Sequence, residues 1–334
     1  MRLKKRIGFF SFLLIAFLLP FIVTSPYHIN IFIMVAINTI LSMTFVLVFR
    51  TGLLTLGIAG FYVIGAYCSA VLTKMLGISF WLALPIGAIV TGIITLMLGL
   101  IIIRSWAKGS ELVFLFFTII FNLVIVKLIG YTEVLGGLSG MIGIPRPEPI
   151  FIPFYGPIEF SGKVPYYYLI CFLLILTMIV FYAFYTSQMG RAWRAIKLSP
   201  QLAASLGINI FRYRLLAFVI SGAFAGLVGS FYASYSTALV PENFGILESI
   251  FFQIYAILGG LNFYISGPII GALILTWIPE LLRISKELEP IISGFILVTL
   301  VVFLPGGILS LPERISRLQT LFVKITRNIS QRSL

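Results

Sequence analysis

Residues 79–103 read SFWLALPIGAIVTGIITLMLGLIII and contain no charged side chain. A helix of this length extends about 37 Å, because each residue adds about 1.5 Å, so it can cross the roughly 30 Å hydrocarbon layer of a bilayer. Similar apolar runs recur along the 334 residues, of which 60% are hydrophobic and only 10% are charged. The sequence therefore predicts an all-α, polytopic integral membrane protein.

The spacing of the apolar runs predicts about ten transmembrane helices, with the N-terminus and the C-terminus both cytoplasmic. In this orientation 17 of the 23 Lys and Arg residues lie inside, as the positive-inside rule expects. The first run follows a basic N-terminus but lacks an A-x-A cleavage site, so we expect it to remain as an anchor. The ten runs are 8–24, 28–49, 53–73, 79–103, 112–130, 166–186, 214–237, 246–264, 267–283 and 290–308.

Several chemical functions lack the residues that they need. The chain has no Asp, a single His (His28), and two cysteines, Cys68 and Cys171, that both lie inside apolar runs. It contains no GxxxxGK[ST], GxSxG or HExxH motif. We therefore expect no enzyme active site, no metal site and no bound cofactor, so that any ATP would be hydrolysed by a separate polypeptide.

Acidic groups that could relay protons within the apolar runs are also scarce. Glu248 stands at the start of a run, and no chain of buried Asp, Glu and His exists for a proton relay. Polar neutral residues could line a pathway, although each is more often a hydrogen-bond partner between helices: Asn38, Thr39, Thr55, Asn122 and Gln253.

Two longer loops and a tail divide the chain. We expect residues 1–312 to form one transmembrane domain, followed by a basic cytoplasmic tail at 313–334. The external loop, 131–165, is rich in Gly and Pro, which predicts an ordered hairpin or a short helix with turns. The cytoplasmic loop, 187–213, carries four positive charges and no acid.

The cytoplasmic loop contains one clear helix signal. Ser199 and Pro200 suit the N-cap and first turn of a helix that runs through Leu206 and stops at Gly207. The adjacent Ala203 and Ala204 would give it a smooth surface, on which another protein can dock closely. An amphipathic connector lying on the lipid surface is the alternative.

Small residues cluster at two other places. Residues 52–70, GLLTLGIAGFYVIGAYCSA, could pack tightly against other helices or form unwound backbone beside a water-filled cavity. Residues 258–272 contain a second glycine cluster, which we expect to break a long apolar stretch into two spans on the cytoplasmic side.

The chain resembles the permease subunits of ABC importers for branched-chain amino acids, in particular the larger, M-type permease. The resemblance extends from about residue 30 to 312 through several ordered matches. They are the run 52–70, FWLALP at 80–85, LGGLSGMIGIP at 135–145, GRAWRAIKLSPQLAASLGIN at 190–209, LLAFVISGAFAGLVGSFYA at 215–233, the glycines of 258–272 and LPGGI at 304–308.

This resemblance implies a multi-pass protein of a prokaryotic inner membrane that has no ATPase site of its own. The implied partners are a second, H-type permease, two ABC ATPase subunits and an external solute-binding protein, with no nucleic acid. For the cytoplasmic loop, the resemblance implies a coupling helix that docks on an ATPase through Gly190, Arg191, Ala203, Ala204 and Gly207. For the run 52–70, the resemblance implies a translocation pathway past Thr55, Gly57, Ile58, Gly60 and Gly65.

The chain departs from the family pattern at both sites. Ser199 and Gln201 stand where acidic residues are usual, and Ile58 and Gly60 stand where His and Ala are usual. Because of these changes, other transported solutes remain alternatives to branched-chain amino acids, namely amides and urea, or sugars and nucleosides. A membrane-embedded enzyme is a distant alternative, because the missing Asp makes a catalytic cluster hard to build.

Overall fold

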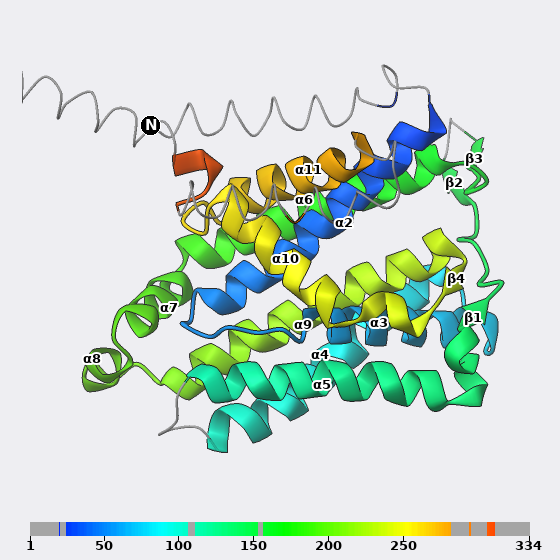
Figure 1. Cartoon of the computed structure of the whole chain (residues 1–334). Helices are drawn as coiled ribbons and strands as arrows, with labels where there is room; N and C mark the ends of the chain where they lie inside the picture. The colour runs from blue at the N-terminus through cyan, green and yellow to red at the C-terminus, as the bar shows by residue number, and fades with distance from the viewer. Residues whose placement is uncertain are drawn as a thin grey trace, which may run out of the picture.

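The computed structural model describes residues 25–105, 111–152, 156–281 and 306–310, together with Pro20 and Gly294. These residues form a bundle of long helices, with short strands at one end and two short helices, α7 (Gln188–Leu198) and α8 (Pro200–Ser205), at the other (Figure 1). The expected first span at 8–24, most of the last at 290–308 and the tail at 313–334 lie outside the described residues.

Five of the described helices are long and apolar enough to cross a membrane. Their mostly apolar sequences leave no sharply polar face, as is typical of helices that contact lipid and other helices. The five are α2 (Pro26–Phe49), α4 (Phe80–Ser105), α5 (Glu111–Tyr131), α6 (Lys163–Thr186) and α9 (Ile210–Ser236). In the described part of the chain, these helices support the prediction of a helical, polytopic membrane protein, while the ten spans and the cytoplasmic termini stay predictions.

Two further helices, α3 (Ile58–Lys74) and α10 (Ile246–Gly259), are shorter than the runs that predicted them. A third, α11 (Ser266–Leu281), extends to the last residue described in this region. The sequence suggested that a span begins at 53, but α3 begins five residues later. The 14 residues of α10 extend only about 21 Å, less than the hydrocarbon thickness.

The second glycine cluster breaks the chain as predicted. α10 ends at Gly259, and Gly260 adopts φ +114°, which favours glycine. Gly259 and Gly267 lie so close that a Cβ on Gly259 would be 1.7 Å from the Gly267 carbonyl oxygen. The small residues therefore form a tight turn between α10 and α11.

Helix α9 runs through the centre of the bundle and contacts α3 and α4 closely. A Cβ on Gly65 of α3 would lie 2.1 Å from the carbonyl oxygen of Gly226, and one on Gly222 would lie 1.9 Å from Thr95 Oγ1 of α4. Since helix packing in lipid depends on close van der Waals contact, these glycines set the distance between the three helices.

The loop 131–165 contains both the turns and the hairpin that its composition suggested. Two 3-10 turns, η1 (Glu133–Leu135) and η2 (Gly137–Ser139), precede β1 (Met141–Ile142), and β2 (Ile150–Ile152) pairs with β3 (Gly156–Ile158).

The same layer includes the chain that follows α9. Strand β1 pairs antiparallel with β4 (Ala238–Leu239), which leads into η3 (Pro241–Phe244). Lys74 Nζ, at the end of α3, donates to the Ile142 carbonyl at 2.6 Å. The loop and β4 therefore form one layer at this end of the bundle, while η3 packs against α3 and α5.

Candidate functional site

A non-helical segment, Thr51–Gly57, runs into the bundle between α2 and α3 (Figure 1). Thr51, Leu53 and Thr55 are buried. Unlike a helix, this segment cannot pair its own backbone N–H and C=O groups. Each unpaired group would cost several kcal/mol in a hydrocarbon environment, so the segment needs partners from other helices.

Side chains of α5, α9 and α10 supply these partners. Thr118 Oγ1 accepts from the Leu56 N–H at 3.1 Å, and Asn122 Nδ2 donates to the Leu56 carbonyl at 3.3 Å. Further bonds run from Gln253 Nε2 to the Thr55 carbonyl (2.9 Å) and from Arg214 Nε to the Thr51 carbonyl (3.2 Å). We call the group formed by Thr55, Leu56, Thr118, Asn122, Ser249 and Gln253 the polar junction.

The change Thr118→Val tests whether the polar junction holds the unwound segment. Valine keeps the shape but leaves the Leu56 N–H without its acceptor, which we expect to lower the free energy of unfolding by about 1–3 kcal/mol. Thr177→Val is the matched control, because the Thr177 hydroxyl bonds only within its own helix, to the Leu173 carbonyl. Thermal unfolding of the detergent-solubilised protein measures both, and equal effects would contradict the assignment.

Two helices begin at the polar junction. The Ala59 N–H, in the first turn of α3, donates to Ser249 Oγ, in the first turn of α10, at 2.9 Å. Ser249 Oγ also accepts from Asn122 Nδ2 at 3.2 Å, and Asn122 lies halfway along α5. Helices that start near the middle of a membrane, after unwound backbone, are typical of transport proteins.

The structure places the predicted pathway residues in two groups. Thr55, Gly57, Ile58 and Gly60 lie together at the polar junction, all buried. The side chains of α5 close over them, since a Cβ on Gly60 would be 3.1 Å from the Phe121 ring. Gly65 instead belongs to the α3–α9 crossing, as the packing interpretation of this run suggested. The pathway role of all five residues stays a prediction.

Sequence reasoning missed two members of the polar junction. Asn122 and Gln253 were among the polar candidates, but Thr118 and Ser249 gave no signal, because a hydroxyl in a helix usually bonds its own backbone. Their role depends on which residues the fold brings to Thr51–Gly57.

The loop 187–213 lies at the opposite end from the strands and contains the predicted helix, α8, together with a second helix, α7, that the sequence did not predict. Ser187 caps α7 (Gln188–Leu198). Ser199 Oγ accepts from the Leu202 N–H at 3.3 Å, which caps α8 (Pro200–Ser205) with Pro200 in its first turn. Gly207 follows with φ +81°. The buried Trp193 anchors the loop by donating from Nε1 to the Tyr213 carbonyl at 2.9 Å.

The five residues expected to dock on an ATPase do not share one surface. Arg191, Ala204 and Gly207 are exposed. Ala203 is only 1% exposed, and a Cβ on Gly190 would meet the Tyr185 carbonyl oxygen at 2.4 Å, so these two pack inward. Their docking role remains a prediction that no contact tests.

Three leucines that sequence reasoning did not single out are the most exposed apolar side chains of this loop. Leu198, Leu202 and Leu206 are 87%, 62% and 72% exposed. Their four-residue spacing was the available signal. We call Leu198, Leu202 and Leu206 the leucine patch.

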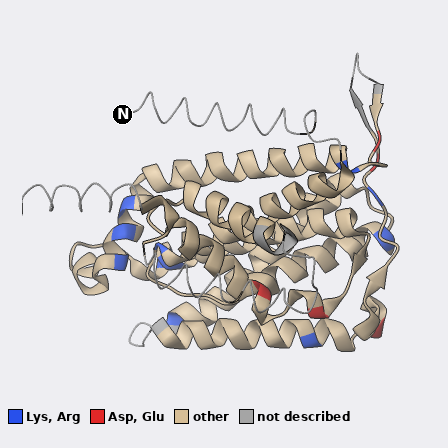
Figure 2. Cartoon of the chain, turned by 45° about the horizontal axis from the view of Figure 1, so that its top comes forward, with Lys and Arg blue, Asp and Glu red and all other residues tan. Residues whose placement is uncertain are grey.

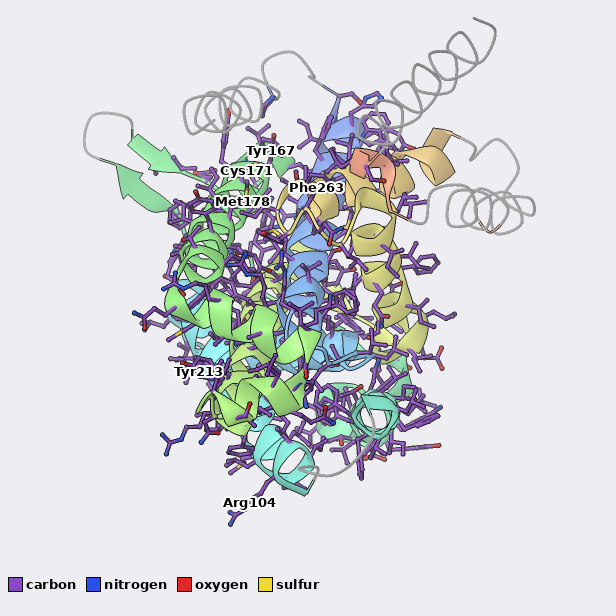
Figure 3. All side chains as sticks on the ribbon, turned by 90° about the vertical axis from the view of Figure 1, so that its left-hand side faces the viewer. Arg104, Tyr167, Cys171, Met178, Tyr213 and Phe263 are labelled. Carbon is purple, nitrogen blue, oxygen red and sulfur yellow. The ribbon has the colours of Figure 1, made fainter. Side chains whose placement is uncertain are left out.

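Positive charge gathers at the same end of the bundle (Figure 2). Figure 3 looks onto this end and shows Arg104 pointing away from the bundle. Arg50, just beyond α2, lies with its guanidinium carbon 3.5 Å from the Tyr264 ring centroid. Burial lowers the pKa of Arg50 from its usual value, but an arginine keeps its charge at neutral pH.

The structure combines long apolar helices, an unwound segment at mid-depth, and the basic loop that contains α7 and α8. These features define a multi-pass membrane protein of the transport class. The family model described as "Branched-chain amino acid transport system / permease component" matches residues 27–304. The chain belongs to this family, and so is a transport component.

Curated relatives include permeases of different solutes. The high-affinity branched-chain amino acid permease protein LivM of Salmonella typhimurium is 32% identical over 92% of this chain and 75% of its own length. A probable branched-chain amino acid permease, LivH of Methanocaldococcus jannaschii, is 32% identical over 64% of this chain and 66% of its own. The guanosine permease NupQ of Bacillus subtilis is 27% identical over 55% and 60%. No solved structure matches.

Proposed function

We propose that this chain is a permease subunit of an ABC importer that carries branched-chain amino acids across a prokaryotic inner membrane. The family match and the similarity to LivM over most of both chains support the solute class. The exposed leucine patch lies in the basic loop that contains α7 and α8. It supports the proposal that an ATPase binds there, because apolar side chains outside the hydrocarbon are typical of a protein-binding surface.

The proposed assembly contains a second, H-type permease, two ABC ATPases and an external solute-binding protein. Similarity to a LivH protein as well as to LivM supports a paired permease. The ATPases would dock at α7 and α8, and the binding protein at the surface formed by 131–165 and η3. ATP is used by the partner subunits, and this chain binds no cofactor.

The proposed topology keeps ten spans with both termini cytoplasmic, in a domain of residues 1–312 followed by the tail 313–334. The end that carries α7 and α8 faces the cytoplasm. Arg191, Arg194 and Lys197 lie there, while Glu133, Glu148 and Glu242 lie at the strand end. This distribution agrees with the positive-inside rule.

Uptake by cells tests this function. A strain that expresses the complete system is expected to accumulate radiolabelled leucine, isoleucine or valine, and deletion of the ATPase gene is expected to abolish that uptake. Uptake that persists through this chain without the ATPase would contradict the proposal. Accumulation of guanosine, urea or amides in place of these amino acids would retain the assignment as an ABC permease and would change the assigned solute.

A further inference from the structure

A carboxylate lies near mid-depth in the bundle. Glu248, in the first turn of α10, directly precedes Ser249, which bonds Asn122 halfway along α5. Because α5 extends about 31 Å, Asn122 lies about 15 Å from either end. The sequence suggested that Glu248 stands at the external end of a span, but α10 begins inside the bundle, so the carboxylate lies near the centre of the hydrocarbon layer.

This carboxylate has no cationic partner within the described part of the chain. The carboxylate is largely desolvated by burial, and no lysine, arginine or histidine of the described residues forms an ion pair with it. A charged side chain at the centre of a bilayer costs at least about 3 kcal/mol, and such residues usually face a partner or a water-filled cavity. We therefore expect the partly exposed Glu248 side chain to bind a cation, which the described residues do not supply.

A second acceptor, on the residue that bonds the neighbouring Ser249, also lacks a donor. Asn122 is fully buried and its Nδ2 group is bonded, yet its Oδ1 atom has no hydrogen-bond partner among the described residues. An ammonium group carries a positive charge and three donors, so it could satisfy a carboxylate and an amide oxygen together.

Aromatic side chains from three helices lie within electrostatic range of the carboxylate. Glu248 interacts electrostatically with the phenols of Tyr62, Tyr232 and Tyr255. The Tyr62 ring centroid lies 5.0 Å from that of Phe244 and 5.5 Å from that of Tyr232. Aromatic faces attract ammonium groups and also offer apolar surface to an aliphatic side chain.

We propose that Glu248 binds the ammonium group of the amino acid in transit, while Tyr62 and Phe244 contact its aliphatic side chain. This inference rests on the proposed function and names the point where the solute passes this subunit. A proton or a sodium ion at Glu248 is the competing occupant.

The test measures ATP-driven uptake of radiolabelled leucine into proteoliposomes that contain the complete complex and the loaded binding protein. Glu248→Gln keeps the shape and removes the charge, so we expect uptake to fall at least tenfold. Glu248→Asp keeps the charge and is expected to retain much more uptake than the Gln variant. The unfolding midpoint of the Gln variant is expected not to fall, because the change removes a desolvated charge.

A photoreactive leucine analogue locates the contact directly. Carried by the binding protein into the wild-type complex, it is expected to label peptides that contain Tyr62 or Phe244, and labelling confined to other regions would overturn the inference. Uptake by Glu248→Gln at the wild-type rate, or wild-type uptake that requires a sodium or proton gradient, would also overturn it. Wild-type vesicles that take up no leucine would overturn the proposed function itself.

Discussion

Replacing Leu202 and Leu206 with aspartate is expected to reduce ATP-driven uptake by more than tenfold. Both side chains are largely exposed on α8 and just after it, outside the bundle. Burying a leucine against a partner contributes about 1.5–3 kcal/mol, and an aspartate there would place an unpaired charge in the contact. The loss should appear both as reduced uptake and as reduced co-purification of the ATPase subunit.

Arg104→Gln is the matched control for this change. Arg104 is exposed at the same end of the bundle but points away from it, at the end of α4 (Figure 3). We expect it to leave both uptake and co-purification unchanged. A double aspartate variant that still binds the ATPase and transports at the wild-type rate would exclude the leucine patch as the coupling surface.

Ala203→Glu would be a less informative test, because Ala203 packs inward. A glutamate at this position would be forced into the packing of α8, so lost transport could reflect a misfolded loop. Ala204→Glu probes the exposed neighbour at the same helix and is expected to weaken ATPase binding without disturbing the spanning helices.

Gly65→Leu is expected to prevent the protein from accumulating in the membrane. Even the first carbon of the new side chain would lie 2.1 Å from the Gly226 carbonyl oxygen, so α3 and α9 would have to separate. Overpacking of this kind costs about 3 kcal/mol or more when the clash is with backbone. Quantitative blotting of isolated membranes measures the loss.

The same substitution at Gly162 provides the comparison. A Cβ there would meet no atom within 4 Å, so Gly162→Leu is expected to accumulate at the wild-type level. Normal accumulation of Gly65→Leu would show that α3 and α9 do not cross as described.

The sequence predicted those features that depend on local chemistry. Long uncharged runs specify spanning helices, Ser199 and Pro200 specify the start of α8, and the glycines around 259–267 specify a tight turn. In each case the residues that decide the structure are neighbours in the chain, so no tertiary information is needed.

Features that depend on distant residues could not be predicted in this way. The true start of α3 at Ile58 follows from hydrogen bonds that Thr118 and Gln253 make to the preceding backbone. The inward face of Ala203 and the outward face of Ala204 follow from how α8 packs on its neighbours. The depth of Glu248 follows from where α10 begins.

The most direct test of the account is leucine uptake into proteoliposomes that contain the purified complex of this chain, its partner permease and the ATPases. The loaded binding protein is placed outside these vesicles, and ATP or a non-hydrolysable analogue is enclosed. We predict that uptake occurs only with hydrolysable ATP and disappears when this chain is left out of the complex. Leucine uptake that is equal with ATP and with the analogue, or that does not require this chain, would contradict the account.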